Sequence, residues 1–374
     1  MSFFPDHERD LAALSAVSRR RRLAPRAGLD FASNDYLGLA SAPRLRAAVQ
    51  NALARGVPIG SGGSRLLRGN HAEHEALEAE AAAFFGTESA LFLASGYAAN
   101  ALLFATLPQR GDLIVYDERI HASAHEGMRL SRAPSRPAKH NDVDAFADTI
   151  ADWRREGGTG RPWIAVESLY SMDGDQAPLT QIADVADRTG AILLIDEAHA
   201  TGVFGPQGRG VSADLPARDN VVTLHTCGKA LGCEGALIAG PATVTDFIVN
   251  RGRAFIFSTA PSPLMAAAVR EALRILQDEP ERRQRLHTLI ALAHERLVPA
   301  GALATGSQIL PLLLGDDART MRAAAALQAQ RFDVRGIRPP TVPAGTARLR
   351  LSLTLNISPQ DIAALSEALA GGFA

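Results

Sequence analysis

The sequence predicts an α/β protein in which helices cover both faces of a mostly parallel β-sheet and a smaller C-terminal α/β domain follows. From about residue 47 onward, short apolar stretches alternate with amphipathic helical stretches, a pattern typical of parallel strands joined by helical crossovers. After Pro261-Ser262-Pro263 a long Ala-, Leu- and Arg-rich helical region begins, which indicates a change of organisation. We therefore expect an N-terminal arm over 1–45, a large domain over 46–263 and a small domain over 264–374.

The hydrophobic pattern predicts the individual elements. Residues 8–23 mix Arg with Leu and Ala at helical spacing, which predicts an exposed N-terminal helix or arm. Short apolar runs predict strands, and the amphipathic stretches between them predict helices. The predicted strands are 90–94, 113–116, 163–167, 192–196, 221–226, 236–239, 309–314 and 348–354, and the predicted helices include 74–85, 100–107, 179–188 and 318–330.

Composition excludes several classes of function. The 374 residues are 47% hydrophobic, which permits a sizeable core, and 39 basic against 40 acidic residues give a net charge of -1. Without a basic excess, and with an aromatic share of 5%, nucleic-acid binding is not expected. The charge-free stretch from Ser89 to Gln109 is interrupted by polar residues and a proline, so no membrane span is expected. Small-molecule chemistry is the remaining prediction.

Cysteine usage and the first residues predict a cytoplasmic protein. Two cysteines cannot form a disulfide framework, and the start MSFFPDHERD lacks both a basic and an apolar signal region, which indicates a reducing compartment. Cys227 and Cys233 by themselves fall short of the four ligands of a structural zinc site. No metal is therefore expected.

Polar residues that follow the predicted strands are candidates for a functional site, because ligands bind at the carboxyl ends of strands in parallel α/β sheets. The strand 192–196 ends in Asp196, and His199 follows three residues later. One interpretation is a helix-capping Asp with a surface His. The other is a carboxylate that pairs with a cationic ring nitrogen of a cofactor, with His199 holding a neighbouring polar group.

The strand 221–226 leads into a small-residue loop that carries Lys229. Desolvation at such a place lowers the pKa of a lysine and frees the amine to form a Schiff base. Lys139 is the only other lysine of the chain, and all other basic residues except histidine are arginines. Lys229 is therefore less easily explained as one of many surface charges that keep the protein soluble. A surface lysine is the alternative.

Two further predicted strands are followed by candidate ligand groups. The strand 90–94 turns through Gly96 into a helix, whose N-terminal N–H groups suit a phosphate, although many strand-to-helix turns contain glycine. His121 follows the strand 113–116 and would suit a position over a planar ring. A structural histidine is the alternative.

Together these segments resemble the α-oxoamine synthases, a family of fold-type-I enzymes that use pyridoxal 5'-phosphate (PLP). The resemblance covers almost the whole chain, and it implies PLP as cofactor and the fold of a fold-type-I PLP-dependent transferase. The motifs that carry it are FASNDYLGL at 31–39, GSGGS at 60–64, SMDGD at 171–175, DEAH at 196–199, GK at 228–229 and IRPPTVPAGTARLR at 337–350.

The resemblance implies roles around the cofactor ring. Lys229 would form the Schiff base, Asp196 would pair with the pyridinium nitrogen, and His121 would stack on the ring. Ser171 and His199 would lie near the phenolic oxygen. Lys229, His121 and Asp196 are therefore the expected catalytic residues.

The resemblance also implies a phosphate site at the subunit boundary of a homodimer. The backbone at Gly96 and Tyr97 would bind the phosphate, with Thr226 adding a hydroxyl. Ser258 and Thr259 would reach it from the neighbouring subunit.

For the substrates, the resemblance implies that Asn34 and Arg350 bind the carboxylate of the amino acid, a group that a guanidinium fits geometrically. Thr341, in the C-terminal motif, is a further predicted substrate contact. The densest cation cluster outside the cofactor site is Arg19 to Arg22. We expect it to cap the remote carboxylate of the acyl chain, with Arg22 preferred, because an unpaired buried carboxylate is costly. A solvated helix end is the alternative.

The implied reaction is the decarboxylative condensation of L-alanine with a pimeloyl thioester of coenzyme A or of an acyl carrier protein. The alternatives are the glycine-using members, 5-aminolevulinate synthase and 2-amino-3-ketobutyrate CoA ligase, and a catalytically silent partner subunit, against which Lys229 argues. The chain departs from the family pattern in two places. The segment 22–31 is expected to lack a small N-terminal strand, and Ala200 stands where the family often has glycine.

Overall fold

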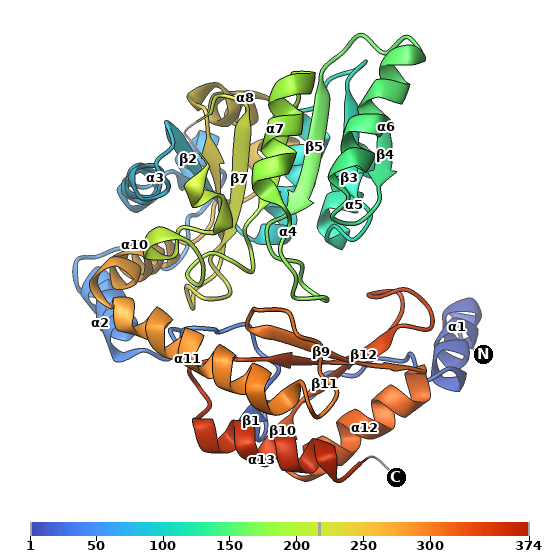
Figure 1. Cartoon of the computed structure of the whole chain (residues 1–374). Coiled ribbons are helices and arrows are strands. Elements are labelled where there is room, and N and C mark those ends of the chain that lie inside the picture. The colour runs from blue at the N-terminus through green and yellow to red at the C-terminus, as the bar shows by residue number, and fades with distance from the viewer. Residues whose placement is uncertain (1, 216–217, 373–374) are drawn as a thin grey trace. The chain divides into compact units, whose positions relative to one another are not determined.

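The computed structural model describes residues 2–215 and 218–372, and the chain divides into two compact units (Figure 1). The sheet unit comprises Leu37–Tyr170 and Gln176–Arg283. The terminal unit comprises Met1–Tyr36, Ser171–Asp175 and Gln284–Ala374.

These units do not follow the boundaries predicted near residues 45 and 263, because long-range packing decides them. Helix α10 (Pro263–Asp278) packs on α2 (Pro43–Ala54) and α3 (Ala72–Phe85), so all three helices belong to the sheet unit. The first 36 residues join the C-terminal part of the chain instead, where β1 (Leu29–Asp30) pairs with β10 (Phe332–Asp333).

The sheet unit contains a seven-stranded sheet in the order β2-β8-β7-β6-β5-β3-β4 (Figure 1). Strand β8 is antiparallel to both of its neighbours, and every other pair in this sheet is parallel. The predicted mostly parallel sheet is therefore confirmed. The edge strand β4 was not predicted, because its sequence SRPA is neither apolar nor alternating. The strands are β2 (Ser89–Leu93), β3 (Leu113–Asp117), β4 (Ser135–Ala138), β5 (Pro162–Glu167), β6 (Ile192–Asp196), β7 (Val221–Thr226) and β8 (Ala236–Gly240).

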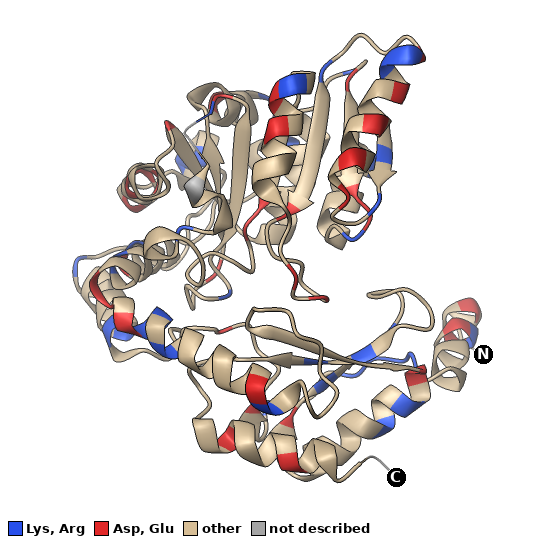
Figure 2. Ribbon diagram, in the orientation of Figure 1, with Lys and Arg blue, Asp and Glu red and all other residues tan. Residues whose placement is uncertain are grey.

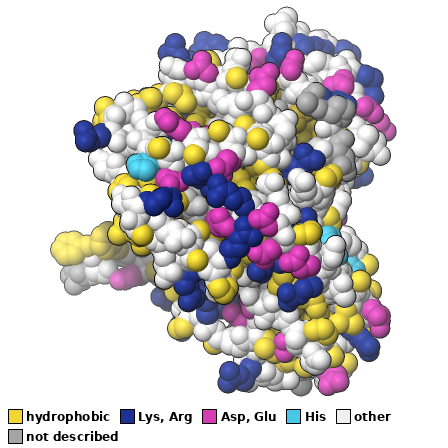
Figure 3. All heavy atoms as spheres, turned by 90° about the vertical axis from the view of Figure 1, so that its left-hand side faces the viewer, with side chains coloured by type: hydrophobic (Ala, Val, Ile, Leu, Met, Phe, Trp, Pro, Cys, Tyr) yellow, Lys and Arg dark blue, Asp and Glu magenta, His cyan; other side chains and the backbone are white. Residues whose placement is uncertain are grey.

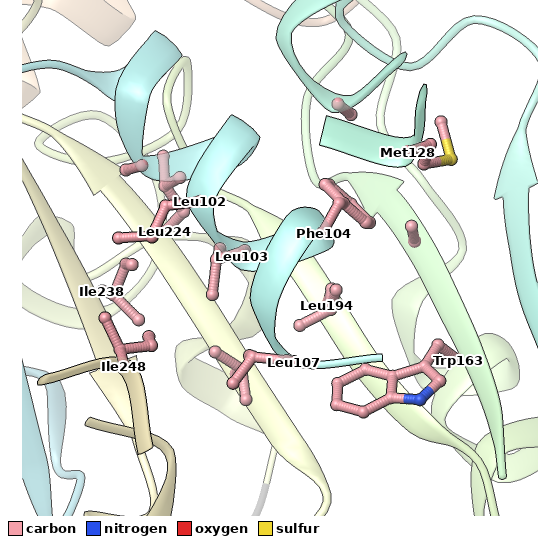
Figure 4. Close-up of a cluster of buried hydrophobic side chains, with 14 of the residues drawn as sticks. Leu102, Leu103, Phe104, Leu107, Met128, Trp163, Leu194, Leu224, Ile238 and Ile248 are labelled. Carbon is pink, nitrogen blue, oxygen red and sulfur yellow. The ribbon is translucent and has the colours of Figure 1, made fainter. Parts of the chain in front are cut away.

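Different helices cover the two faces of this sheet, because successive side chains of a strand point to opposite faces. On one face, Trp163 and Leu194 pack with buried residues of α4 and α5 (Figure 4). On the other face, their neighbours Ile164 and Leu193 pack with α6 and α7. The helices are α4 (Gly96–Thr106), α5 (Ala122–Leu130), α6 (Val143–Arg155), α7 (Leu179–Thr189), α8 (Ala242–Arg251) and α9 (Arg253–Ile256).

Charged side chains lie mainly on the helices and loops of the sheet unit, and the strands carry few (Figure 2). Three exceptions are buried carboxyl groups at the carboxyl ends of adjacent strands: Asp117 on β3, Glu167 on β5 and Asp196 on β6, with exposures of 0%, 2% and 8%. Acidic residues are seldom buried unless they are paired. The carboxyl edge of this sheet is therefore the place to look for chemistry.

The terminal unit contains a three-stranded antiparallel sheet in the order β11-β12-β9. The expectation that the segment 22–31 lacks a small strand is wrong. Strand β1 is only two residues long and exists through its parallel pairing with β10, which no local pattern reveals. The other elements are α1 (Pro5–Ala16), α11 (Pro280–Leu297), β9 (Ile309–Gly315), α12 (Asp317–Ala329), β11 (Arg335–Ile337), β12 (Ala347–Ser352) and α13 (Pro359–Ala370).

The surface carries both signs of charge in close alternation. Figure 3 shows basic and acidic side chains interspersed on one face. In the sheet unit, Arg44 forms ion pairs with Glu271 and Asp278 at 2.6 Å each. Within the described part of the chain, no helix combines the length and the apolar character needed to cross a bilayer.

A buried histidine makes the stability of the sheet unit depend on pH. His225, in β7, is 1% exposed, hydrogen-bonded to Thr201 and Thr223 at 2.9 Å each, and stacked on Phe85. Burial lowers the pKa of His225 from 6.5 to about 3. Between these values the unfolded chain binds a proton that the folded chain excludes, so the free energy of unfolding decreases as the pH falls.

We expect His225→Gln to weaken this pH dependence. His225 makes the free energy of unfolding change by up to about 1.4 kcal/mol per pH unit, and the variant lacks this contribution. The variant should also be less stable at neutral pH, because the stacking on Phe85 is lost. Urea unfolding at a series of pH values below 6.5 measures the slope. His287→Gln, an exposed position on α11, is the control. Equal slopes for wild type and His225→Gln would contradict this account.

Candidate active site

The carboxyl ends of β5, β6 and β7 border a cavity of about 170 Å³ in the sheet unit. Ligands bind at this edge in parallel α/β sheets, so the cavity is the candidate active site. Seven of the ten residues predicted for the cofactor line it: Gly96, Tyr97, His121, Asp196, His199, Thr226 and Lys229. The other lining residues are Asn100, Ser123, Glu167, Ala198 and Leu224.

Lys229 lies in the loop that follows β7, and its side chain is partly buried. Its Nζ is 2.8 Å from Nε2 of His199, which is 4% exposed. Backbone hydrogen bonds close the loop, since Cys233 N–H donates to the carbonyl of Cys227 and Gly232 N–H donates to that of Lys229, both at 2.9 Å. The loop thus presents a primary amine to the cavity.

Asp196 is the last residue of β6, and hydrogen bonds from two different elements orient its carboxylate. Oδ1 accepts from the Ala198 N–H at 2.9 Å, and Oδ2 accepts from Nδ2 of Asn100 in α4 at 2.6 Å. The alternative of a helix-capping Asp does not hold, because the residues after it, 198–203, form turns rather than a helix.

Helix α4 begins at the cavity and presents backbone donors to it. The Ser95 hydroxyl caps the helix by accepting from the Ala98 N–H at 3.1 Å, and the N–H groups of Gly96 and Tyr97 have no acceptor inside the helix. A Cβ at Gly96 would lie 3.3 Å from Oγ1 of Thr226. Glycine therefore lets the helix N-terminus lie close to the Thr226 hydroxyl, and together these donors suit a phosphate.

His121 is the N-cap residue of α5. Its Nδ1 accepts from the backbone N–H of Ser123 at 3.2 Å and lies 2.8 Å from Oγ of Ser123. Partial burial lowers the pKa of His121, the cations Lys229 and His125 add to this, and the Asp196 carboxylate opposes it. Part of the ring stays exposed, which leaves the imidazole accessible to a planar group.

Three buried polar residues of the cavity, Asn100, Ser123 and Glu167, received no role from the sequence. Asn100 and Ser123 are 5% and 0% exposed, and Asn100 Nδ2 donates to Ser123 Oγ at 3.1 Å. A signal was present for Asn100, since it is the one polar residue between Ala98 and Phe104 in an apolar helix. Nothing local distinguishes Ser123, because its contact with Asn100 comes from another helix, α4.

The terminal unit brings together Asn34 and Arg350, the two residues predicted for the amino-acid carboxylate. Arg350 is 6% exposed, and its Nη2 donates to the Tyr36 hydroxyl at 3.4 Å. The Tyr36 hydroxyl in turn donates to Oδ1 of Asn34 at 3.0 Å. Burial raises the pKa of Tyr36 against the opposing charge of Arg350, so the phenol stays protonated. Sequence reasoning missed Tyr36, although it lies inside the FASNDYLGL motif.

Ser171 also belongs to the terminal unit, where its carbonyl accepts from Nε of Arg350 at 2.7 Å. Its predicted role toward the cofactor stays a prediction. Ser258 and Thr259 are exposed residues of the sheet unit, outside the cavity lining.

The predicted arginine cluster is held within the terminal unit. Nε of Arg19 forms an ion pair with Asp317 at 2.6 Å, and Nη2 of Arg21 donates to the exposed Thr341 hydroxyl at 3.2 Å. Arg22 is exposed, and within the described residues no hydrogen bond or ion pair fixes its guanidinium.

The chemistry of the cavity fits PLP. The amine of Lys229 can react with the aldehyde of PLP, and the buried carboxylate of Asp196 can pair with its ring nitrogen. The imidazole of His121 can lie against the ring face. The N-terminus of α4 and the Thr226 hydroxyl can bind the phosphate. The fold and this site define a fold-type-I PLP-dependent enzyme.

The chain belongs to the aminotransferase class I and II family, whose model matches residues 26–369. It is 43% identical over 361 residues to the 8-amino-7-oxononanoate synthase of Anaeromyxobacter dehalogenans (strain 2CP-1), which covers 92% of this chain and 89% of the relative. It is 44% identical over 334 residues to that of Chromobacterium violaceum, covering 88% and 85%.

Solved structures agree with this family. Serine palmitoyltransferase from S. paucimobilis with a bound PLP–myriocin aldimine has a TM-score of 0.90 and 26% identity, over 98% of this chain and 96% of that chain. The 8-amino-7-oxononanoate synthase of Francisella tularensis has a TM-score of 0.78 and 27% identity, over 92% and 97%. PLP is therefore the cofactor, and the chain is a PLP-dependent transferase.

Proposed function

We propose that this chain is a cytoplasmic C-acyltransferase of biotin synthesis. It condenses L-alanine with a pimeloyl thioester to give 8-amino-7-oxononanoate, carbon dioxide and the free thiol. The observation that carries the proposal is the Lys229 amine, 2.8 Å from His199, in a cavity that also contains Asp196. These groups argue against a catalytically silent subunit. A chain of this length with only two cysteines suits a reducing compartment.

In this proposal each group of the cavity has a role toward the cofactor. When bound, PLP supplies an electron sink that stabilises the carbanion formed at the α-carbon of alanine. Lys229 holds the cofactor through its amine, with His199 beside it. Asp196 keeps a proton on the ring nitrogen, and His121 stacks on the ring. The phosphate is bound by Gly96, Tyr97 and Thr226.

Lys229 also moves the proton of the reaction. With PLP and alanine bound, the Lys229 amine would act as the general base that removes the α-proton of alanine. The α-carbon then attacks the thioester carbonyl, the thiol leaves, and carbon dioxide is lost from the alanine carboxyl group. Lys229 would then return a proton to the same carbon.

Arg350 is suited to the alanine carboxylate by the hydrogen bonds it already makes. Its Nε donates to the Ser171 carbonyl, one Nη1 hydrogen to Ser352 Oγ at 2.6 Å, and one Nη2 hydrogen to Tyr36. Of the five N–H groups of a guanidinium, this leaves one on each terminal nitrogen among the contacts of the described residues. A carboxylate bound end-on by two hydrogen bonds requires such a pair.

The experiment that tests the proposed function crosses alanine and glycine with several acyl thioesters of coenzyme A and of acyl carrier protein. We expect turnover with L-alanine and pimeloyl thioester, measured as 8-amino-7-oxononanoate by mass spectrometry. Faster turnover with glycine and succinyl or acetyl thioester would assign the chain to the glycine-using members instead.

We expect Arg22→Gln to raise the KM for the pimeloyl thioester about tenfold or more, the effect of losing a hydrogen bond to a charged group. An uncharged acyl thioester of equal length has no remote carboxylate, so its KM should stay unchanged. Arg19→Gln is the matched control, because the Arg19 charge is already paired with Asp317. Equal effects of Arg22→Gln on both thioesters would show that Arg22 serves only the carrier or the surface.

We propose a homodimer in which Ser258 and Thr259 complete the phosphate site of the neighbouring subunit. Both side chains are exposed. Three large apolar side chains of the sheet unit are exposed as well: Phe257, next to Ser258, at 72%, Leu67 at 84% and Ile59 at 74%. In a homodimer, contact with the second subunit would cover exposed apolar side chains of this kind.

A subunit-mixing experiment tests this arrangement. Lys229→Ala and Thr259→Asp chains are each expected to be inactive, the second because an added carboxylate repels the phosphate. A mixed dimer carries both changes at one site and neither at the other, so mixing should restore activity. Sedimentation confirms the oligomeric state. If the mixture stays inactive although mixed dimers form, Thr259 serves its own subunit.

A further inference from the structure

We propose that Asn100 and Ser123 are positioning residues that join Asp196 and His121 into one hydrogen-bonded chain and so hold both groups in place for the PLP ring. This inference rests on the proposed roles of Asp196 at the ring nitrogen and His121 on the ring face. The chain runs from Asp196 Oδ2 to Asn100 Nδ2 at 2.6 Å, from there to Ser123 Oγ at 3.1 Å, and on to His121 Nδ1 at 2.8 Å.

Each hydrogen bond in this chain has only one possible direction. A carboxylate accepts and does not donate, so Asn100 must turn its NH₂ group, and not its carbonyl, toward Asp196. The two hydrogens of Nδ2 then serve Asp196 and Ser123. Ser123 Oγ accepts one of them, and its own hydrogen can be donated to His121 Nδ1 when that nitrogen carries no proton.

A backbone donor sets the tautomer of His121. Nδ1 also accepts from the backbone N–H of Ser123 at 3.2 Å, a donor that cannot reverse. Nδ1 therefore carries the lone pair, and the single proton of the neutral imidazole lies on Nε2. The Ser123 hydroxyl therefore donates to Nδ1 while it accepts from Asn100, and the chain from Asp196 to His121 is complete in one direction.

Close helix packing makes the chain possible. Asn100 comes from α4 and Ser123 from α5, and these helices touch at Gly127, where a Cβ would lie 2.8 Å from the carbonyl oxygen and 2.9 Å from the Cα of Ala101. Only glycine permits this approach. Both polar side chains are buried, at 5% and 0% exposure, so loss of either hydrogen bond would leave groups that water cannot easily satisfy.

The charged groups around His121 are consistent with a neutral ring. Lys229 in the loop after β7 and His125 in α5 disfavour a second proton, as does desolvation, while Asp196 on β6 favours one. The net effect lowers the pKa of His121. The Ser123 hydroxyl acts in the same direction, because a hydrogen bond donated to the neutral ring stabilises the neutral form.

The first test observes His121 directly by NMR in the PLP-loaded protein, with histidines labelled with ¹³C and ¹⁵N. The His121 signal is assigned by its loss in His121→Gln. We expect a neutral ring protonated on Nε2 in the wild type. Ser123→Ala removes the hydroxyl donor and should raise the pKa of His121 by about half a unit to one unit. Ser131→Ala, at the other end of α5, is the control. Ser123→Ala keeps the backbone N–H, so the tautomer should stay the same; an unchanged pKa in this variant would overturn the proposed link to His121.

The second test breaks the chain at Asn100 and measures PLP affinity before any turnover. Asn100→Leu keeps the size but removes the donors, and it should weaken PLP binding about tenfold and lower kcat about 10- to 100-fold while the KM for alanine changes little. Asn100→Asp keeps the shape but sets a second carboxyl group against Asp196, so its PLP affinity should fall further as the pH rises and both groups ionise.

These readouts separate a positioning role from a purely structural one. A lower melting temperature with wild-type PLP affinity and kcat in Asn100→Leu would overturn the proposal, and so would a pH-independent PLP affinity in Asn100→Asp. If Asn100→Leu does not fold, Asn100→Asp and Ser123→Ala still decide the matter. Neither the NMR signal nor PLP binding depends on an acyl substrate, so a failure of the proposed reaction would not be mistaken for a failure of this inference.

Discussion

Lys229→Ala is expected to lower turnover by at least about 10³-fold, because one substitution removes both the amine that holds the cofactor and the general base. The described part of the cavity contains no other primary amine, and His199 would lose its partner at 2.8 Å. The fold should persist, because the loop is closed by backbone hydrogen bonds between Cys227 and Cys233. Product formation measures the rate, and circular dichroism checks the fold.

Lys139→Ala is the matched control, since the chain has only these two lysines. Lys139 is 77% exposed and lies 3.9 Å from Asp142, so its loss should leave turnover unchanged. Borohydride treatment of the wild-type holoenzyme should fix the cofactor on the peptide that contains Lys229, as mass spectrometry would show. A reducible linkage that survives in Lys229→Ala would refute the assignment.

Asp196→Asn is expected to slow α-proton removal from alanine by about 10² or more, the scale of losing a preorganised electrostatic partner. A neutral amide cannot stabilise the charge of a protonated ring nitrogen as a carboxylate does. The structure adds a second effect. Both oxygens of Asp196 face donors, Ala198 N–H and Asn100 Nδ2, so the NH₂ group of an asparagine would meet one of them. We therefore also expect a loss of about 1–3 kcal/mol in the free energy of unfolding.

Hydrogen exchange at the α-carbon of L-alanine in deuterated water measures the catalytic effect at saturating PLP, separately from stability. Asp246→Asn, an exposed position on α8, is the control and should exchange at the wild-type rate. If Asp196→Asn exchanges as fast as the wild type, Asp196 is not the partner of the ring nitrogen.

Local pattern was sufficient to predict most of the sheet and the residues at its carboxyl edge. A residue that follows a short apolar run lies at a strand end, and the carboxyl ends of parallel strands share one edge of the sheet. Asp196, His121 and Lys229 were predicted from this rule and line the same cavity. The substrate-binding residues were predicted from the motif resemblance instead. Two of them, Asn34 and Arg350, are both hydrogen-bonded to the Tyr36 hydroxyl.

By itself, then, the sequence determined which segments form strands and which side chains stand at their ends, because both follow from neighbours a few positions away. Tertiary structure alone decided the limits of the two units, the two-residue strand β1 and the chain from Asp196 to His121. Asn100 and Asp196 lie 96 positions apart, and Arg19 and Asp317 lie 298 apart. Such contacts form only when packed helices and strands bring distant segments together, so no periodicity or spacing within a segment can reveal them.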